Sequence, residues 1–87
     1  NRIGDIAEHY AITYLWDSGY NVYKNCGCTG PVDLVAMTPE GKIILVDVKS
    51  LHGGKLGGRT DEQKRLGVQF LRFNSTTRKM KFVEHKV

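Results

Sequence analysis

The sequence is poor in the features that build a membrane span or a disulfide-stabilised scaffold. Its apolar runs are all too short to cross a bilayer, and no signal-peptide pattern opens the chain. Its only cysteines are Cys26 and Cys28, which flank a single glycine. Cysteines so close together rarely form a disulfide, and a zinc site would need two further ligands. We therefore expect no membrane partner, and free thiols in a reducing, intracellular compartment.

The chain also lacks a strong excess of charge of either sign. Its 13 lysines and arginines and 9 acidic residues give a net charge of +4 and a pI of about 9.2. This mild balance permits a polyanionic partner without requiring one. With 87 residues and no internal repeats, the sequence predicts one domain over residues 1–87, with a modest core.

The central stretch of the chain has the pattern of a β-hairpin. Residues 32–37 alternate in polarity as a strand does, and residues 43–48 are apolar on both faces, which is typical of a central buried strand. Between them, Pro39 is placed to open a turn and Gly41 is placed to take a positive φ. We therefore predict a hairpin with a three-residue loop.

Closing this hairpin on Thr38 and Lys42 fixes which residues face each other. The predicted pairs are Met37 with Ile43, Val35 with Leu45, and Asp33 with Asp47. Two opposed carboxylates repel and destabilise a sheet, and a bound divalent cation would remove the repulsion. Lys49 lies two residues after Asp47 and projects from the same face. Two acids and a lysine beside a buried strand suit metal-assisted hydrolysis of a phosphodiester.

The segments Pro31-Val32-Asp33 and Asp47-Val48-Lys49 together resemble the PD-(D/E)XK nuclease signature. The resemblance implies a restriction-endonuclease-like core and a Mg²⁺-dependent DNA endonuclease in which Mn²⁺ substitutes. It implies that Asp33 and Asp47 hold the metal together with the Val48 carbonyl, while Lys49 orients or activates the attacking water and stabilises charge on the phosphate. The alternative is that these residues have no catalytic role: Asp33 would then be an acid at the start of a strand, and Asp47 and Lys49 would form a surface ion pair.

The first segment, Arg2–Asp17, is predicted to be a helix because its apolar residues recur at helical spacing and Gly19 can end it. Glu8 lies on a flank that we expect to be largely buried, so its carboxylate needs a partner. It either reaches solvent or a lysine, or it completes the metal site. Nucleases of the Holliday junction resolvase type carry a similar Gly-x-x-x-Glu, here Gly4 to Glu8, and this resemblance implies a catalytic, metal-binding Glu8.

Residues 51–59 form a glycine-rich stretch that follows the Lys49 strand. Lys55 and Arg59 could contact DNA phosphates there, or the stretch could be a plain mobile loop. Thr60 and Gln63 then have the spacing of a capping box that starts a short helix, ending near residues 66–67.

Capping alone can explain Gln63. Some homing endonucleases and resolvase-like proteins of the superfamily place a Gln near the scissile phosphate, so the resemblance adds a catalytic role for Gln63. Lys64 and Arg65 follow on the same helix and could bind the DNA backbone.

A strand over residues 20–24 precedes the central hairpin, and a closing hairpin is predicted from residues 68–73 and 79–83. In the last strand Lys79 and Lys81 alternate with apolar residues. They either discourage edge aggregation or face DNA. The order α-β-β-β-α-β-β predicts an α/β domain with a mixed, mostly antiparallel sheet flanked by helices.

The sequence therefore favours a DNA endonuclease, acting on junctions or branched DNA or as a sequence-specific homing-type enzyme. A nuclease-derived module that binds DNA without cutting it, and a small interaction domain unrelated to DNA, remain open. Cutting both strands with one site per subunit favours a homodimer or a higher homo-oligomer.

Overall fold

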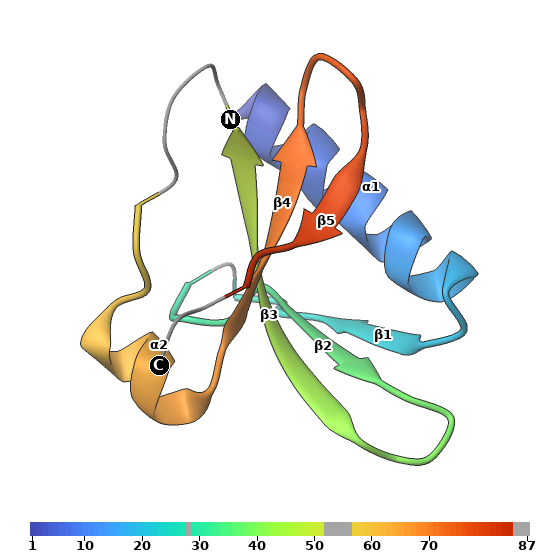
Figure 1. Cartoon of the computed structure of the whole chain (residues 1–87), viewed down its shortest axis with the longest axis vertical. Coiled ribbons are helices and arrows are strands. Elements are labelled where there is room, and N and C mark those ends of the chain that lie inside the picture. The colour runs from blue at the N-terminus through green and yellow to red at the C-terminus, as the bar shows by residue number, and fades with distance from the viewer. Residues whose placement is uncertain (28, 52–56, 85–87) are drawn as a thin grey trace.

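The computed structural model describes residues 1–27, 29–51 and 57–84. Its helices and strands follow the predicted order (Figure 1). They are α1 (Arg2–Asp17), β1 (Asn21–Lys24), β2 (Leu34–Met37), β3 (Ile43–Leu51), α2 (Asp61–Leu66), β4 (Gln69–Asn74) and β5 (Met80–Phe82). Neither described helix is long and apolar enough to span a membrane.

The five strands form one sheet in the order β1-β2-β3-β4-β5. Neighbouring strands are antiparallel except β3 and β4, which run parallel. Parallel neighbours need a crossover connection, and the segment that contains α2 provides it. The predicted mixed, mostly antiparallel α/β fold is therefore confirmed.

Helix α1 begins and ends where the sequence predicts. The Gly4 N–H donates to Oδ1 of Asn1 at 2.8 Å, so Asn1 caps the first turn. Gly19 follows the last turn with φ +94°, a backbone conformation that favours glycine.

The hairpin of β2 and β3 has the predicted register. Met37 pairs with Ile43 and Val35 pairs with Leu45. The Thr38 N–H donates to the Lys42 carbonyl at 2.9 Å, and Gly41 has φ +88°. One expectation for β3 is wrong: Ile43 is 52% exposed rather than buried, because α1 covers only one face of the sheet.

Most strand ends differ from the prediction by one or two residues. Strand β2 begins at Leu34 rather than at residue 32, so Asp33 lies just before it. Strand β3 continues to Leu51, the first residue of the stretch expected to be a loop, because β4 pairs with it as far as Leu51. Asp47 and Lys49 therefore lie on β3 beyond the last β2 pair, Leu34 with Val46.

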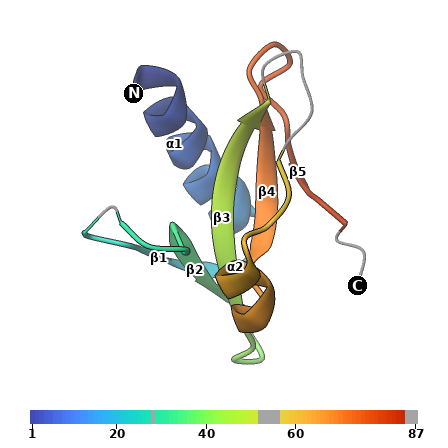
Figure 2. The ribbon, with the colours of Figure 1, turned by 90° about the vertical axis from the view of Figure 1, so that its left-hand side faces the viewer.

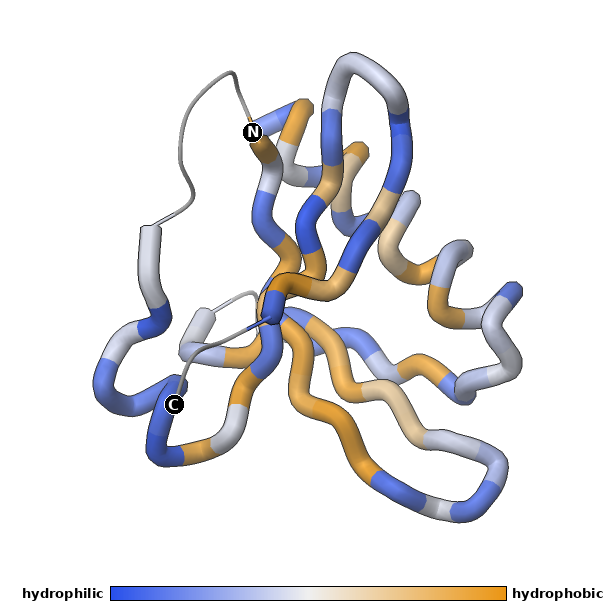
Figure 3. The backbone as a smooth tube through the Cα atoms, viewed as in Figure 1, coloured by the Kyte–Doolittle hydropathy of each residue, from blue (hydrophilic) through white to orange (hydrophobic). Residues whose placement is uncertain are grey.

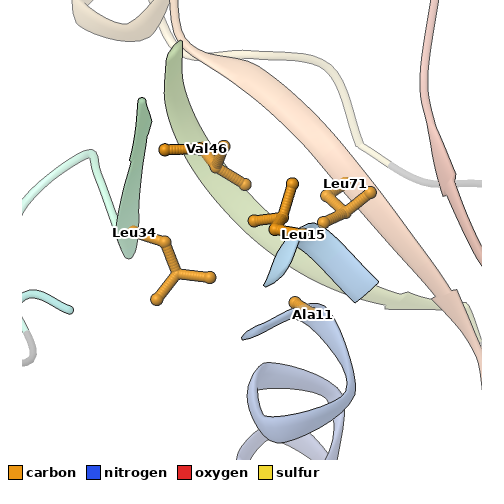
Figure 4. Close-up of a cluster of buried hydrophobic side chains, with 6 residues drawn as sticks. Ala11, Leu15, Leu34, Val46 and Leu71 are labelled. Atoms are coloured by element: carbon orange, nitrogen blue, oxygen red, sulfur yellow. The ribbon is translucent and has the colours of Figure 1, made fainter. Parts of the chain in front are cut away.

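The core lies between α1 and one face of the sheet (Figure 2). Side chains from the helix and from three strands converge there (Figure 4): Ala11, Leu15, Leu34, Val46 and Leu71. Along the tube of Figure 3, hydrophobic segments follow the central strands, while the loop between β2 and β3 is largely hydrophilic. Helix α2 lies beside the start of β4 and leaves much of the other face uncovered by a helix (Figures 1 and 2).

Candidate functional site

The site is built around the carboxyl groups of Asp33 and Asp47. The Asp33 N–H donates to the Val46 carbonyl at 2.9 Å, which fixes the backbone of Asp33 beside β3. Oδ2 of Asp33 accepts the Val48 N–H at 2.8 Å. The Asp47 carboxyl lies close enough to that of Asp33 to alter its acidity. Two carboxylates so close repel each other, which disfavours ionisation of both.

The Asp33 carboxyl has an altered acidity for reasons visible in this geometry. Its pKa is raised to about 6, chiefly by burial and next by the contact with the Asp47 side chain, while the hydrogen bond from the Val48 N–H lowers it. The negative charges of Asp47 and Glu8 also raise the pKa of Asp33. This combination of burial and like charge is common at functional sites.

Asp47 is buried within β3, with 8% of the residue exposed. Its Oδ2 accepts the Gln63 Nε2–H at 2.7 Å and lies 3.3 Å from Nζ of Lys49. An amide and an ammonium group therefore meet one oxygen of a carboxyl that also contacts Asp33.

Gln63 serves the helix cap and the site at the same time. Its side-chain Oε1 accepts the Thr60 backbone N–H at 3.1 Å, and its backbone N–H donates to Thr60 Oγ1. These two bonds form the capping box. Its Nε2 donates to Asp47 and to the Pro31 carbonyl, at 3.0 Å for the latter. The two explanations that the sequence left open for Gln63 are therefore compatible.

Lys49 is one of the residues that line a pocket of about 550 Å³ on the α2 side of the site. Asp47, Gln63, Thr60 and Glu62 are among the other lining residues. Nζ of Lys49 is 5.2 Å from the centroid of the Phe70 ring, and 44% of the side chain is exposed. The ammonium group can therefore reach an anion in the pocket without leaving Asp47.

Glu8 faces a second pocket, of about 300 Å³, which Asp33 and Val48 also line. It forms an ion pair with Lys24, with Oε1 and Nζ 3.0 Å apart. In the ranges that the structure describes, no three acidic, histidine or cysteine side chains are close enough together to hold a metal ion. Of the two possibilities left open for Glu8, contact with a lysine or solvent and completion of the metal site, the structure shows contact with a lysine. Lys24 could not be identified as that partner from the sequence, because it lies on a separate element, β1.

The oxygen donors nearest the carboxyl pair suit a hard divalent cation. Asp33 and Asp47 supply carboxylates, and Val48 supplies a carbonyl that points to the same side of β3 as its N–H, toward Asp33. Strand β2 pairs with β3 only as far as Val46, so this side of Val48 is not used by β2. A cation there would relieve the repulsion between the two carboxylates, and these donors therefore fit Mg²⁺.

The four basic residues expected to bind DNA differ in their positions. Lys55 lies outside the described residues. Arg59 donates from Nη1 to the Val68 carbonyl at 3.2 Å, so part of its guanidinium supports the chain before β4. Lys64 and Arg65 are exposed on α2.

Comparison with solved structures finds a bacterial homing endonuclease, I-Ssp6803I, with a TM-score of 0.68 and 25% sequence identity. The match covers 92% of this chain and 61% of that protein, so the chain spans about three-fifths of its length. No protein-family model and no curated protein matches the sequence. The chain thus has an α/β fold similar to that of a nuclease.

Proposed function

We propose that this chain is the nuclease domain of a metal-dependent DNA endonuclease. The observation that carries the proposal is the close pair of carboxyl groups of Asp33 and Asp47, with Lys49 and Gln63 both in contact with Asp47. The likeness to a homing endonuclease supports DNA as the substrate. The PD-(D/E)XK resemblance of these residues supports the same reaction.

Asp33, Asp47 and the Val48 carbonyl are the proposed ligands of Mg²⁺, with Mn²⁺ as a substitute. Bound there, Mg²⁺ would polarise a phosphoryl oxygen and make a bound water more acidic. Glu8 faces the same pocket as Asp33, so it can serve as an outer or second-metal ligand after it exchanges Lys24 for the cation.

Lys49 and Gln63 are proposed to act on the phosphate and on Asp47. The Lys49 ammonium, held beside Asp47, orients the attacking water and stabilises negative charge that develops on the phosphate oxygens. Gln63 positions Asp47 through its Nε2–H, while the helix cap fixes the other end of its amide.

A sequence-specific, homing-type activity is favoured over junction cleavage because the similar structure is that of a homing endonuclease. One site of this kind cuts one strand. We therefore propose that a homodimer or a higher homo-oligomer cuts both strands. We also propose that the protein acts inside the cell, where its DNA substrate is found.

The test is a cleavage assay with supercoiled plasmid, four-way junction and flap DNA, with and without Mg²⁺. The parent protein should cut at least one substrate only when Mg²⁺ is present. Asp33→Asn should lose this activity, whereas Asp17→Asn, a matched change at an exposed position at the end of α1, should keep it.

The substrates and the variant separate the competing functions. Preferential cutting of the junction or flap would favour a structure-specific enzyme. DNA binding without any cutting would favour a non-cleaving module. Neither binding nor cutting would contradict the proposed function.

A further inference from the structure

Three basic side chains lie in one row across the sheet. Lys49 on β3 pairs with Arg72 on β4, and Arg72 pairs with Lys81 on β5. Paired residues on neighbouring strands project from the same face. We call these three residues the cationic row.

The cationic row lies on the face opposite α1. Its members alternate along their strands with core residues on the α1 side, for example Val48, Leu71 and Phe82. Arg72 is partly buried and Lys81 is exposed. Asp47 is two residues from Lys49 on the same strand and shares this face, so the row begins at the proposed active site.

Three like charges side by side destabilise a sheet unless an anion lies between them. Lys49 is paired with Asp47. Within the described part of the chain, no carboxylate forms an ion pair with Arg72 or Lys81. A lysine on an edge strand discourages aggregation, which accounts for Lys81 on β5. It does not account for Arg72, because β4 has a partner on each side.

The dimensions of the row suit the backbone of a nucleic acid. Neighbouring strands are about 4.8 Å apart, so the row spans roughly 10 Å between its outer members. Phosphates along one strand of duplex DNA follow each other at about 3.4 Å of helix axis, so the row can reach about three of them. Arginine and lysine are also the side chains that most often contact phosphates.

We propose that the cationic row binds consecutive phosphates of one DNA strand, which crosses the sheet from β3 toward β5. This inference rests on the proposed function, because it places the phosphate to be cut at the Lys49 end. Arg72 and Lys81 then hold the phosphates that follow on one side of the cut.

The test is the salt dependence of DNA binding by the double variant Arg72→Gln/Lys81→Gln. Binding of a short fluorescein-labelled duplex is followed by anisotropy in EDTA, which prevents metal-dependent cutting. Loss of two phosphate contacts should weaken binding and reduce the slope of log affinity against log salt by about 1.8, near 0.9 for each contact. The same loss should appear with a second duplex of unrelated sequence, because phosphate contacts carry no sequence information.

Arg2→Gln/Lys42→Gln is the matched control, since it removes one exposed arginine and one exposed lysine away from the row. Lys81→Gln alone is the second variant, because its exposed side chain can change without disturbing the fold, and its slope should fall by about 0.9. If both row variants lose no more slope than the control while the parent binds, the inference is wrong and the proposed function stands. If the parent binds no duplex at all, the inference is wrong, and the cleavage assay with the three DNA substrates decides the proposed function separately.

Discussion

Asp33 is the residue whose surroundings depart furthest from those of an ordinary surface acid. Its carboxyl is partly buried, lies against a second carboxyl and accepts a backbone N–H from Val48. Burial and the neighbouring acid favour the protonated form, and a cation between the acids would favour the ionised one. The same contacts therefore predict how this residue responds to pH and to substitution.

In metal-free buffer, the Asp33 carboxyl should make the protein less stable as the pH rises from about 4 to about 6. Its pKa is about 6 in the folded protein and 3.8 in a model peptide, so the folded state holds the proton more tightly in this window. The free energy of unfolding should therefore fall with rising pH there, and it should fall less in Asp33→Asn. Urea unfolding in EDTA across this range measures the difference. Parallel pH profiles of the two proteins would contradict a raised pKa.

Lys49→Ala should lose far more of the cleavage rate than of the DNA affinity, in which Lys49 accounts for one phosphate contact of the cationic row. The ammonium is proposed to act on charge that develops in the transition state, where one such contact is worth about 2.7–4 kcal/mol, or roughly 10²–10³ in rate. Single-turnover cleavage and duplex binding in EDTA measure the two effects separately. Equal losses in both would make Lys49 a simple phosphate anchor. Lys42→Ala, in the loop between β2 and β3, is the control.

Some of these residue positions follow from the sequence and others do not. Asp33, Asp47 and Lys49 could be placed together because a short hairpin loop fixes the register on both sides of it. The partner of Glu8 could not be found in this way. Lys24 reaches Glu8 from β1, and the sequence does not determine how α1 lies against that strand.

At the scale of elements, α2 is a short helix that delivers one buried side chain to the site. It has six residues, too few to be stable alone in water, so its cap and its contact with Asp47 support each other. The capping box was readable from Thr60 and Gln63. The second use of Gln63 was not, because it depends on the crossover that brings α2 beside Asp47.

Gln63→Ala should reduce cleavage more than Thr60→Ala does, although both break the capping box. Loss of a cap costs about 1 kcal/mol of stability, and both variants should show a loss of this order. Only Gln63→Ala also removes the Nε2–H that holds Asp47. Urea unfolding and single-turnover cleavage, both well below the melting temperature, compare the two. Equal losses of cleavage would mean that Gln63 acts only through the fold.

Leu15→Ala tests the packing of α1 against the sheet. Leu15 is fully buried in the cluster with Leu34, Val46 and Leu71 (Figure 4). Removing its side chain should cost about 2–5 kcal/mol of stability. Chemical unfolding measures the loss, and a cost below about 1 kcal/mol would contradict the described core.

For the whole molecule, the sequence predicted the class and order of elements better than it predicted the surface. Alternating polarity and turn residues fixed each hairpin separately. The parallel pairing of β3 with β4 joins the two hairpins, and a long connection does not set the register of its strands as a short hairpin loop does. That register is what aligns Lys49 with Arg72 and Lys81. The sequence therefore predicts that the last strand has a basic face, but it does not predict that this face is aligned with Lys49 at the proposed active site.

Metal binding by the carboxyl pair is the most direct test of the proposed nuclease site. Mg²⁺ or Mn²⁺ at about 100 times its dissociation constant should stabilise the parent by about 2.7 kcal/mol. The melting temperature should therefore rise with metal concentration in the parent and in Asp17→Asn, and should not rise in Asp33→Asn. A metal-dependent rise in melting temperature of the same size in Asp33→Asn, or no rise in the parent, would contradict a metal site at Asp33 and Asp47.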